Sequence, residues 1–538
     1  MQRRWLSPLF ALLAVAPGGC GGKSPQADRP GATAKTETPA AEAPAPLLAP
    51  CPDAPDLRCG TIEVLEDRSK PDGRRIGIHV VVAPALSDSP KADPIFFFAG
   101  GPGDSSARNA AGEAKEMADL RHEHDLVFVD QRGTGESNLL QCDVPGSDED
   151  PRGYFEEHYN EEMVRRCRET LEARADLTMY TTSITMDDVD EVRERLGYEK
   201  ITLVGGSYGT RAAQVYMRRH TAHVRSAILI GTAGMKQHLP LYHARDSQAA
   251  MDGLLAACAQ DKACKKAFPR VRKELDTVIA RLTRAPARVK IDDPKTGGTI
   301  EVSISRGVFA ENLRFSMYSP GVGVAAPLLI HQAHAGDFEP FARITLATEP
   351  WLRKALAWGM HLSVTCSEDV PFFPEDIGPL VAGTYLGDYR ARLQQRACAL
   401  WPRGEIPEGY HEPVAVDVPT LLLSGALDPV TPPRWAEEVA QHLPKHLHVV
   451  LAEGHHGFGG LSNGECIAEI MSRFLETGQV EGLDTTCAQT MKRPAFLTKV
   501  AELDALLEAL EGPPPEAETQ GPSGEGEGEG EDEGGEAP

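Results

Sequence analysis

The stretch Val204–Thr210, with the sequence Val-Gly-Gly-Ser-Tyr-Gly-Thr, constrains the fold of this chain more than any other segment. It ends an apolar run, Ile201–Val204, and begins a segment with helix-like spacing of apolar residues, so it predicts a strand, a tight turn and a helix. Ser207 lies between Gly205 and Gly209, and glycine avoids side-chain clashes on both sides of so sharp a turn. The stretch therefore predicts a nucleophile elbow, in which the turn lifts the Ser207 hydroxyl clear of a sheet.

A glycine-rich loop is the alternative interpretation, and partner residues elsewhere in the chain decide between the two. A serine nucleophile needs a base that accepts its proton and a carboxylate that orients the base. Asp428 and His455 each follow an apolar run that predicts a strand. We assign His455 as the base because it directly follows the glycine at the strand end, and its neighbour His456 remains the alternative. The order Ser207, Asp428, His455 is the order of an α/β-hydrolase triad.

A glycine-rich loop also follows an earlier strand. The continuous apolar run Ile95–Phe98 predicts a strand covered on both faces, and it leads into Gly100 and Gly101. Loops at the carboxyl ends of such strands form the site in open α/β folds. Glycine lets a backbone N–H approach a ligand closely, as an oxyanion hole requires, although an ordinary turn is the alternative.

The remaining patterns predict the architecture. The segments Cys59–Val64 and Ile76–Val82 alternate apolar and polar residues at period two, which predicts antiparallel strands at one edge of a sheet. After the run Ala227–Ile230, no comparable strand run occurs until Thr420, and residues 235–415 have mostly helical spacing. We expect an α/β-hydrolase fold, with a mostly parallel central sheet and a helical lid inserted between late strands.

The two ends of the chain predict export and disorder. Arg3 and Arg4, an apolar run and small residues before Cys20 have the pattern of a signal peptide, and the small residues resemble a lipobox, which predicts lipidation of Cys20. The alternative is an ordinary signal-peptidase site and a free cysteine. We expect an envelope lipoprotein on the periplasmic face or cell surface, or a secreted protein without lipidation. The predicted division is signal peptide 1–19, a Pro/Ala-rich tether 20–48, core 49–234, lid 235–415, core with a C-terminal cysteine segment 416–510, and an acidic tail 511–538.

The cysteine count agrees with export. There are eleven cysteines, and setting Cys20 aside leaves an even number in a compartment where disulfides persist. Short loops lose the least conformational entropy on closure, which favours local pairs. The expected pairs are Cys51 with Cys59, Cys142 with Cys167, Cys258 with Cys264, Cys366 with Cys398, and Cys466 with Cys487. A metal site is the rival interpretation, and no zinc-like spacing of cysteine and histidine supports it.

Charge excludes one class of partner. The formal net charge is −24, much of it in the Gly/Glu-rich C-terminal tail, and no basic stripe indicates nucleic-acid binding. We expect a monomer without cofactor or metal that contacts the membrane only through its lipid anchor and binds peptide substrates.

Four motifs together resemble those of proline iminopeptidases and, more closely, the secreted tripeptidyl-aminopeptidase-like branch of the α/β-hydrolases. The likeness runs from about Cys51 to Phe496. It implies a serine exopeptidase that removes single residues or tripeptides from a free N-terminus, with an oxyanion hole from the backbone N–H of Tyr208 and one in Gly100–Gly101. Ala99 departs from the histidine usual in proline iminopeptidases. The motifs are Gly100-Gly101-Pro102-Gly103, Asp130-Gln131-Arg132-Gly133-Thr134-Gly135-Glu136-Ser137, Gly205-Gly206-Ser207-Tyr208-Gly209 and Gly425-Ala426-Leu427-Asp428-Pro429-Val430-Thr431-Pro432.

An aminopeptidase also needs a group that binds the substrate ammonium, and carboxylates in a desolvated pocket do this best. The segment Cys366–Asp369 resembles the acidic segment that such enzymes use, so we expect Glu368 first and Asp369 second to bind the amino terminus. An ordinary solvated acidic pair is the alternative. The expected function is an exported serine aminopeptidase. The alternatives are an esterase or amidase with the same machinery, because fold and triad do not fix the acyl group, and a surface protein with a relic site.

Overall fold

The computed structural model describes residues 47–292 and 297–511 of the 538-residue chain. The predicted signal peptide 1–19, Cys20, nearly all of the tether and the acidic tail after residue 511 lie outside the described residues. No helix in the described ranges is long and apolar enough to cross a membrane.

A nine-stranded sheet forms the centre of the fold, in the order β1-β2-β3-β5-β4-β6-β7-β10-β11. The first strands pair antiparallel up to β5, and the strands from β5 through β11 run parallel. This confirms the predicted mostly parallel sheet with an antiparallel entry. The strands are β1 (Ala49–Cys51), β2 (Ala54–Leu65), β3 (Arg75–Ala83), β4 (Ile95–Phe98), β5 (Leu126–Val129), β6 (Ile201–Gly206), β7 (Val224–Ile230), β10 (Thr420–Gly425) and β11 (His446–Leu451).

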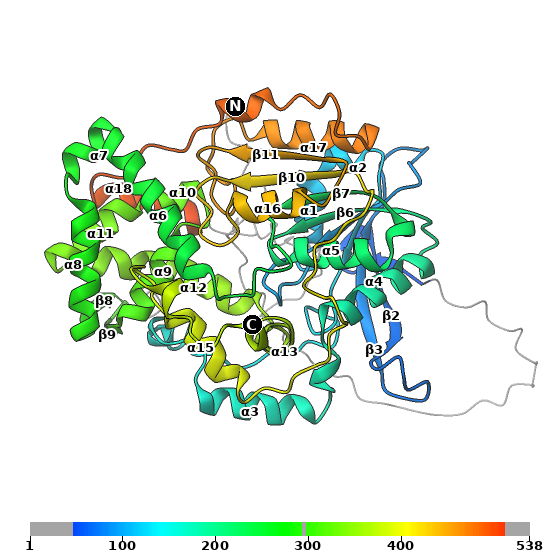
Figure 1. Ribbon diagram of the computed structural model, residues 1–538, viewed down its shortest axis with the longest axis horizontal. Coiled ribbons are helices and arrows are strands. Elements are labelled where there is room, and N and C mark those ends of the chain that lie inside the picture. Colours follow the sequence, from blue (N-terminus) through cyan, green and yellow to red (C-terminus); the bar gives the residue numbers. More distant parts are fainter. Residues whose placement is uncertain (1–46, 293–296, 512–538) are drawn as a thin grey trace, which may run out of the picture.

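Helices cover both faces of the sheet (Figure 1). One face packs on α4, α5 and α16, and the other on α1, α2 and α17, through two separate apolar clusters. Every residue of β4, β5 and β6 is buried, as expected of strands covered on both sides. The bounds are α1 (Ala110–Glu116), α2 (Ala118–Arg121), α4 (Thr182–Arg195), α5 (Tyr208–Arg219), α16 (Pro433–Ala440) and α17 (Glu465–Thr477).

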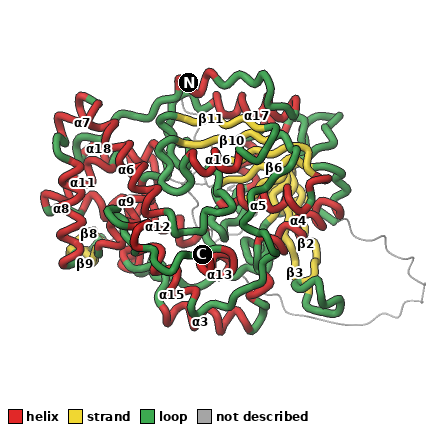
Figure 2. The backbone as a smooth tube through the Cα atoms, viewed as in Figure 1, coloured by secondary structure: helices red, strands yellow, loops and turns green. Residues whose placement is uncertain are grey.

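The chain between the neighbouring strands β7 and β10 forms a second, mostly helical region (Figure 2). It also contains a β-hairpin of β8 (Ala287–Asp292) and β9 (Thr299–Ile304), which the helical expectation for 235–415 missed. Its helices are α6 (His243–Gln260), α7 (Lys262–Ala267), α8 (Val271–Arg284), α9 (Arg306–Ser316), α10 (Pro320–Gly323), α11 (Ala326–Ala335), α12 (Glu339–Ala355), α13 (Trp358–Glu368), α14 (Gly378–Val381) and α15 (Tyr389–Cys398).

Two further helices join this region. Helix α3 (Glu161–Glu172) shares an apolar cluster with α13 and α15. Helix α18 (Ala501–Glu511) packs its leucines against α11 and α12 rather than the sheet, and Arg343 pairs with Asp504 at 2.7 Å. Short 3₁₀ helices are η2 (Pro151–Phe155), η3 (Leu177–Met179), η4 (Thr221–His223), η5 (Val370–Phe372) and η6 (Thr486–Thr490).

The five expected cysteine pairs are all bonded in the structure. The bond between Cys366 and Cys398 ties the end of α13 to the end of α15. Both helices contribute residues to the wall of the cavity described next, so this disulfide holds part of that wall together.

Candidate active site

Ser207 lies on the sharp turn between β6 and α5. Its φ is 55° and its ψ is −123°, a strained combination for a residue with a side chain. A Cβ on Gly205 would lie 2.4 Å from the Gly209 carbonyl oxygen, and a Cβ on Gly209 would lie 2.0 Å from that of Phe98. Neither position can hold a larger residue without movement of the backbone. The two glycines therefore permit the turn that presents Ser207 at the carboxyl end of the sheet.

Asp428 lies in the loop after β10 and is 1% exposed. Its Oδ1 accepts hydrogen bonds from the backbone N–H groups of Val430 at 2.7 Å and Thr431 at 2.8 Å. Its Oδ2 accepts the Thr431 hydroxyl at 2.8 Å. Burial opposes ionisation, but His456 and these donors outweigh it and lower the pKa of the carboxyl. Asp428 is therefore ionised, and the three hydrogen bonds fix the orientation of its side chain. The sequence did not predict the hydrogen bond from Thr431 to Asp428.

His456, rather than His455, is the histidine beside Asp428. Its Nδ1 lies 2.8 Å from Asp428 Oδ2 and 3.0 Å from the Thr431 hydroxyl. The His455 ring instead bonds the Met317 carbonyl oxygen through Nδ1 at 2.9 Å. Burial lowers the pKa of His455 to about 4, so its ring is neutral at neutral pH. Our choice of His455 is therefore corrected: the two adjacent side chains have different partners, and only His456 contacts the carboxylate.

Ser207 and His456 line the same cavity, whose volume is about 210 Å³. The glycine loop after β4 forms another part of its wall, and a Cβ on Gly100 would lie 3.2 Å from the Ser207 Cβ. Gly101 lines the cavity as well and has a φ of 108°, which favours glycine. Tyr208, the first residue of α5, also borders this space. All three predicted oxyanion-hole residues thus line the cavity that contains Ser207.

Glu368 and Asp369, the predicted ammonium-binding pair, do not line this cavity. Glu368 is fully buried, and its carboxylate accepts the Thr182 backbone N–H at 2.6 Å and the Tyr410 hydroxyl. Burial raises the pKa of Glu368 to about 7. Asp369 accepts Arg211 Nη1 at 2.8 Å in an ion pair in which both side chains are fully buried. Because these carboxylates bind groups of the protein itself, the geometry does not support the predicted role.

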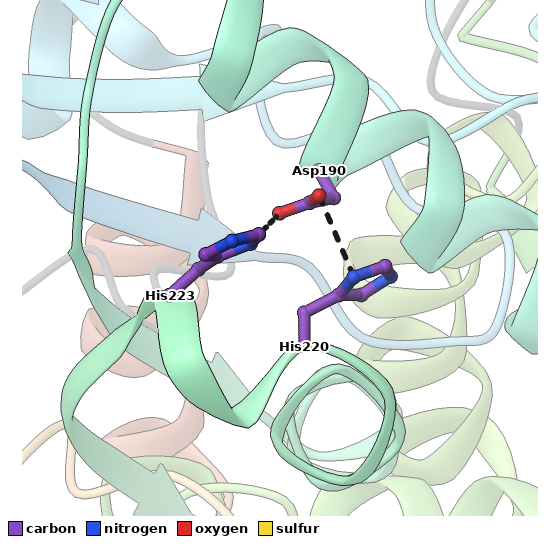
Figure 3. A group of neighbouring side chains, drawn as sticks. All are labelled: Asp190, His220 and His223. Carbon is purple, nitrogen blue, oxygen red and sulfur yellow. Dashed lines mark hydrogen bonds and ion pairs between the residues drawn. The ribbon is translucent and has the colours of Figure 1, made fainter.

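One cluster offers three potential metal ligands: Asp190, His220 and His223 (Figure 3). Asp190 Oδ1 already accepts Arg193 Nε and His223 Nδ1, both at 2.7 Å. Burial alone would raise the pKa of Asp190, but hydrogen bonds from Arg193, Tyr216 and His223 lower it to about 2. Arg193 thus already supplies the positive charge that a metal ion would bring to Asp190. The cluster joins α4 to the end of α5, about 18 Å along the helix from Ser207.

Comparisons with known proteins agree with this geometry. Residues 93–267 match the family model described as alpha/beta hydrolase fold, and residues 383–487 match the model described as TAP-like protein. Serine protease Hip1 of Mycobacterium tuberculosis is 24% identical over 477 residues, covering 80% of this chain and 87% of that protein. Tripeptidyl aminopeptidase of Streptomyces lividans is 25% identical over 484 residues, covering 80% and 84%.

Solved structures with a similar arrangement include proline iminopeptidase of Mycobacterium smegmatis, with a TM-score of 0.37 and 17% identity over 78% of this chain and 98% of that chain. Another is an esterase of Thermogutta terrifontis, with a TM-score of 0.35 and 16% identity over 78% and 99%.

Proposed function

We propose that this chain, a serine hydrolase with the α/β-hydrolase fold, is an exported exopeptidase that removes single residues or tripeptides from the free N-terminus of peptides. The observation that carries the proposal is the meeting of three loops in one cavity. The elbow after β6 brings Ser207, and the loop after β11 brings His456. The loop after β10 brings Asp428, whose hydrogen bond with Nδ1 fixes the orientation of the His456 ring.

In the proposed mechanism, Ser207 Oγ attacks the scissile carbonyl carbon while His456 Nε2 takes its proton. Asp428 holds Nδ1 protonated and stabilises the imidazolium that forms. The C–N bond then breaks, and His456 gives the proton to the leaving amine. Water, deprotonated by His456, attacks the acyl-enzyme and releases the N-terminal fragment and Ser207.

Negative charge develops on the carbonyl oxygen during both attacks. The backbone N–H of Tyr208 and one from Gly100 or Gly101 are the proposed donors to this oxygen. Donors fixed in the backbone need no reorganisation during the reaction. In a comparable serine enzyme, loss of one oxyanion-hole donor, there a side-chain amide, costs about 10²–10³ in rate.

The preference for peptides draws on the two relatives named above, a serine protease and a tripeptidyl aminopeptidase. Export draws on the N-terminal sequence and on the five disulfides, which persist in oxidising compartments. The proposed location is the cell envelope through a lipidated Cys20, or the medium without that lipid.

An esterase acting on non-peptide acyl groups is the second candidate. The cavity wall includes Phe315, Trp351 and Trp358, and such aromatic side chains also fit an apolar acyl chain.

The test is a panel of aminoacyl and tripeptidyl anilides, each with a free and an N-acetylated amino terminus, together with simple esters. The exopeptidase proposal expects turnover of free-amine anilides and little turnover of blocked ones. Turnover of esters alone would support the second candidate. Ser207→Ala should abolish all of these activities, and unchanged turnover in that variant would refute the mechanism itself.

A further inference from the structure

The carboxyl groups that line the Ser207 cavity differ in whether an arginine of the protein pairs with them. Three line the cavity in the described part of the chain: Asp104, Glu113 and Glu311. Glu311 accepts Arg314 Nη2 at 2.6 Å, and Asp104 lies 3.2 Å from Arg108 Nη1. Two of the three negative charges are therefore compensated by arginines of the protein.

Glu113 is the exception. Its side chain makes no hydrogen bond or ion pair with any described residue, although it is only partly exposed. It lies on α1, the helix that follows the Gly100–Gly101 loop beside Ser207. Burial and, to a smaller extent, the carboxylates of Asp104 and Glu116 raise the pKa of Glu113 to about 8. A carboxylate in such surroundings is costly unless a cation binds it.

A second, independent observation shows that this cavity suits a polar ligand. His243 and His361 also line it, with exposed fractions of only 8% and 6%. Both ring nitrogens of His243 and Nε2 of His361 have no hydrogen-bond partner among the described atoms. Burial lowers the pKa of both rings, so both are neutral at neutral pH. Buried polar groups in folded proteins are almost always satisfied, and neutral imidazoles pair well with peptide N–H and C=O groups.

We propose that Glu113 binds the α-ammonium group of the substrate and thereby selects peptides with a free N-terminus. The inference deepens the proposed function and rests on it. It also replaces Glu368 and Asp369, whose carboxylates bind Thr182 and Arg211 outside the cavity. A substrate ammonium supplies the missing counter-ion, whereas an N-acetylated peptide or a simple ester leaves Glu113 uncompensated.

The proposal predicts a pH dependence of selectivity. Since the pKa of Glu113 is about 8, its ionised fraction rises about tenfold per pH unit below that value. The α-amino group of a peptide loses its proton above about pH 8. The ratio of kcat/KM for free-amine substrates to that for esters should therefore peak near pH 8. Taking the ratio removes the pH dependence of the chemical step, which both reactions share.

The direct test measures binding without turnover. The Ser207→Ala protein is titrated calorimetrically with a tripeptide amide and with its N-acetylated form. We expect the free-amine form to bind at least about tenfold more tightly, as a hydrogen-bonded charge pair typically contributes. Adding Glu113→Gln should remove this preference. Adding Glu116→Gln, an exposed glutamate on the same helix that does not line the cavity, should leave it intact.

Two results would overturn the assignment: equal binding of both peptides by Ser207→Ala, or an unchanged preference in the Glu113→Gln variant. Glu113→Asp keeps the charge and should restore part of the preference. If Glu113→Gln does not fold, a reduced preference in a folded Glu113→Asp variant supports the assignment, and an unchanged preference overturns it. Failure of the proposed function is separate, because it appears as wild-type protein that binds free-amine peptides but hydrolyses only esters.

Discussion

Substitution of His456 tests which of the two adjacent histidines is the catalytic base. His456→Gln removes the base that bonds Asp428 at 2.8 Å, while the polar side chain keeps much of the volume. Loss of a triad histidine lowers kcat by roughly 10⁴–10⁶, which corresponds to about 5–8 kcal/mol of activation free energy. Any remaining rate comes from binding and from the backbone donors near Gly100 and Tyr208.

His455→Gln is the matched control. His455 is fully buried and bonds the Met317 carbonyl, so its loss should cost about 1–3 kcal/mol of folding free energy. Its kcat should stay within about tenfold of wild type. The assay is ester and anilide turnover, with denaturant unfolding of each variant measured in parallel. A His455→Gln protein that is stable but loses activity as severely as His456→Gln, or an active His456→Gln protein, would refute the assignment.

Three further perturbations follow from the packing. Gly209→Ala places a Cβ 2.0 Å from the Phe98 carbonyl oxygen, so we expect this variant to lose activity and to unfold at a lower midpoint. Gly112→Ala is the control: the space around its Cβ position is open, so this variant should be neutral or more stable by up to about 1 kcal/mol. Thr431→Val removes a hydroxyl that donates a hydrogen bond to Asp428, so kcat should fall about tenfold with little change in KM. Steady-state kinetics of this single variant would check the expectation. Because burial raises the pKa of Glu368 from 4.5 to about 7, its ionisation costs stability as pH rises through that window. The unfolding free energy of wild type should therefore fall relative to Glu368→Gln between about pH 5 and 7, and parallel curves would contradict this.

The features that the sequence predicted well are local. The elbow depends on Gly205 and Gly209 within a few residues of Ser207, and the strands before Asp428 and His456 are short apolar runs. Turn chemistry and strand ends are readable in such windows, so the sheet, the serine and the aspartate could be placed from sequence alone.

The corrected features depend on residues far away in the chain. His455 turns toward Met317, 138 positions earlier, and no local pattern reveals that contact. Glu368 accepts a hydrogen bond from the backbone N–H of Thr182, 186 positions earlier. A local rule therefore chose the wrong histidine, and the resemblance of a short segment chose an acidic pair outside the cavity.

The hairpin β8–β9 is a different case. Its two strands alternate apolar and polar residues at period two, as in Ala287–Asp292 and Thr299–Ile304, so a signal was present in the sequence. It was missed because the surrounding segment is helical.

Glu113 had no recognisable motif. Its distinguishing property, a carboxylate in the Ser207 cavity without a counter-ion, exists only once α1 is placed beside the glycine loop. Neighbouring Asp104 is also a carboxyl group of this cavity but is paired with Arg108. Such a difference between two acidic residues of one cavity requires the three-dimensional structure.

Covalent trapping tests the central claim most directly, that Ser207 is a nucleophile activated by His456 and Asp428. The protein is treated with a serine-directed fluorophosphonate, and the adduct is located by peptide mass spectrometry. We predict one adduct, on Ser207, that forms at a similar rate in His455→Gln and far more slowly in His456→Gln. An adduct on another residue, or equal labelling rates in wild type and His456→Gln, would contradict the account.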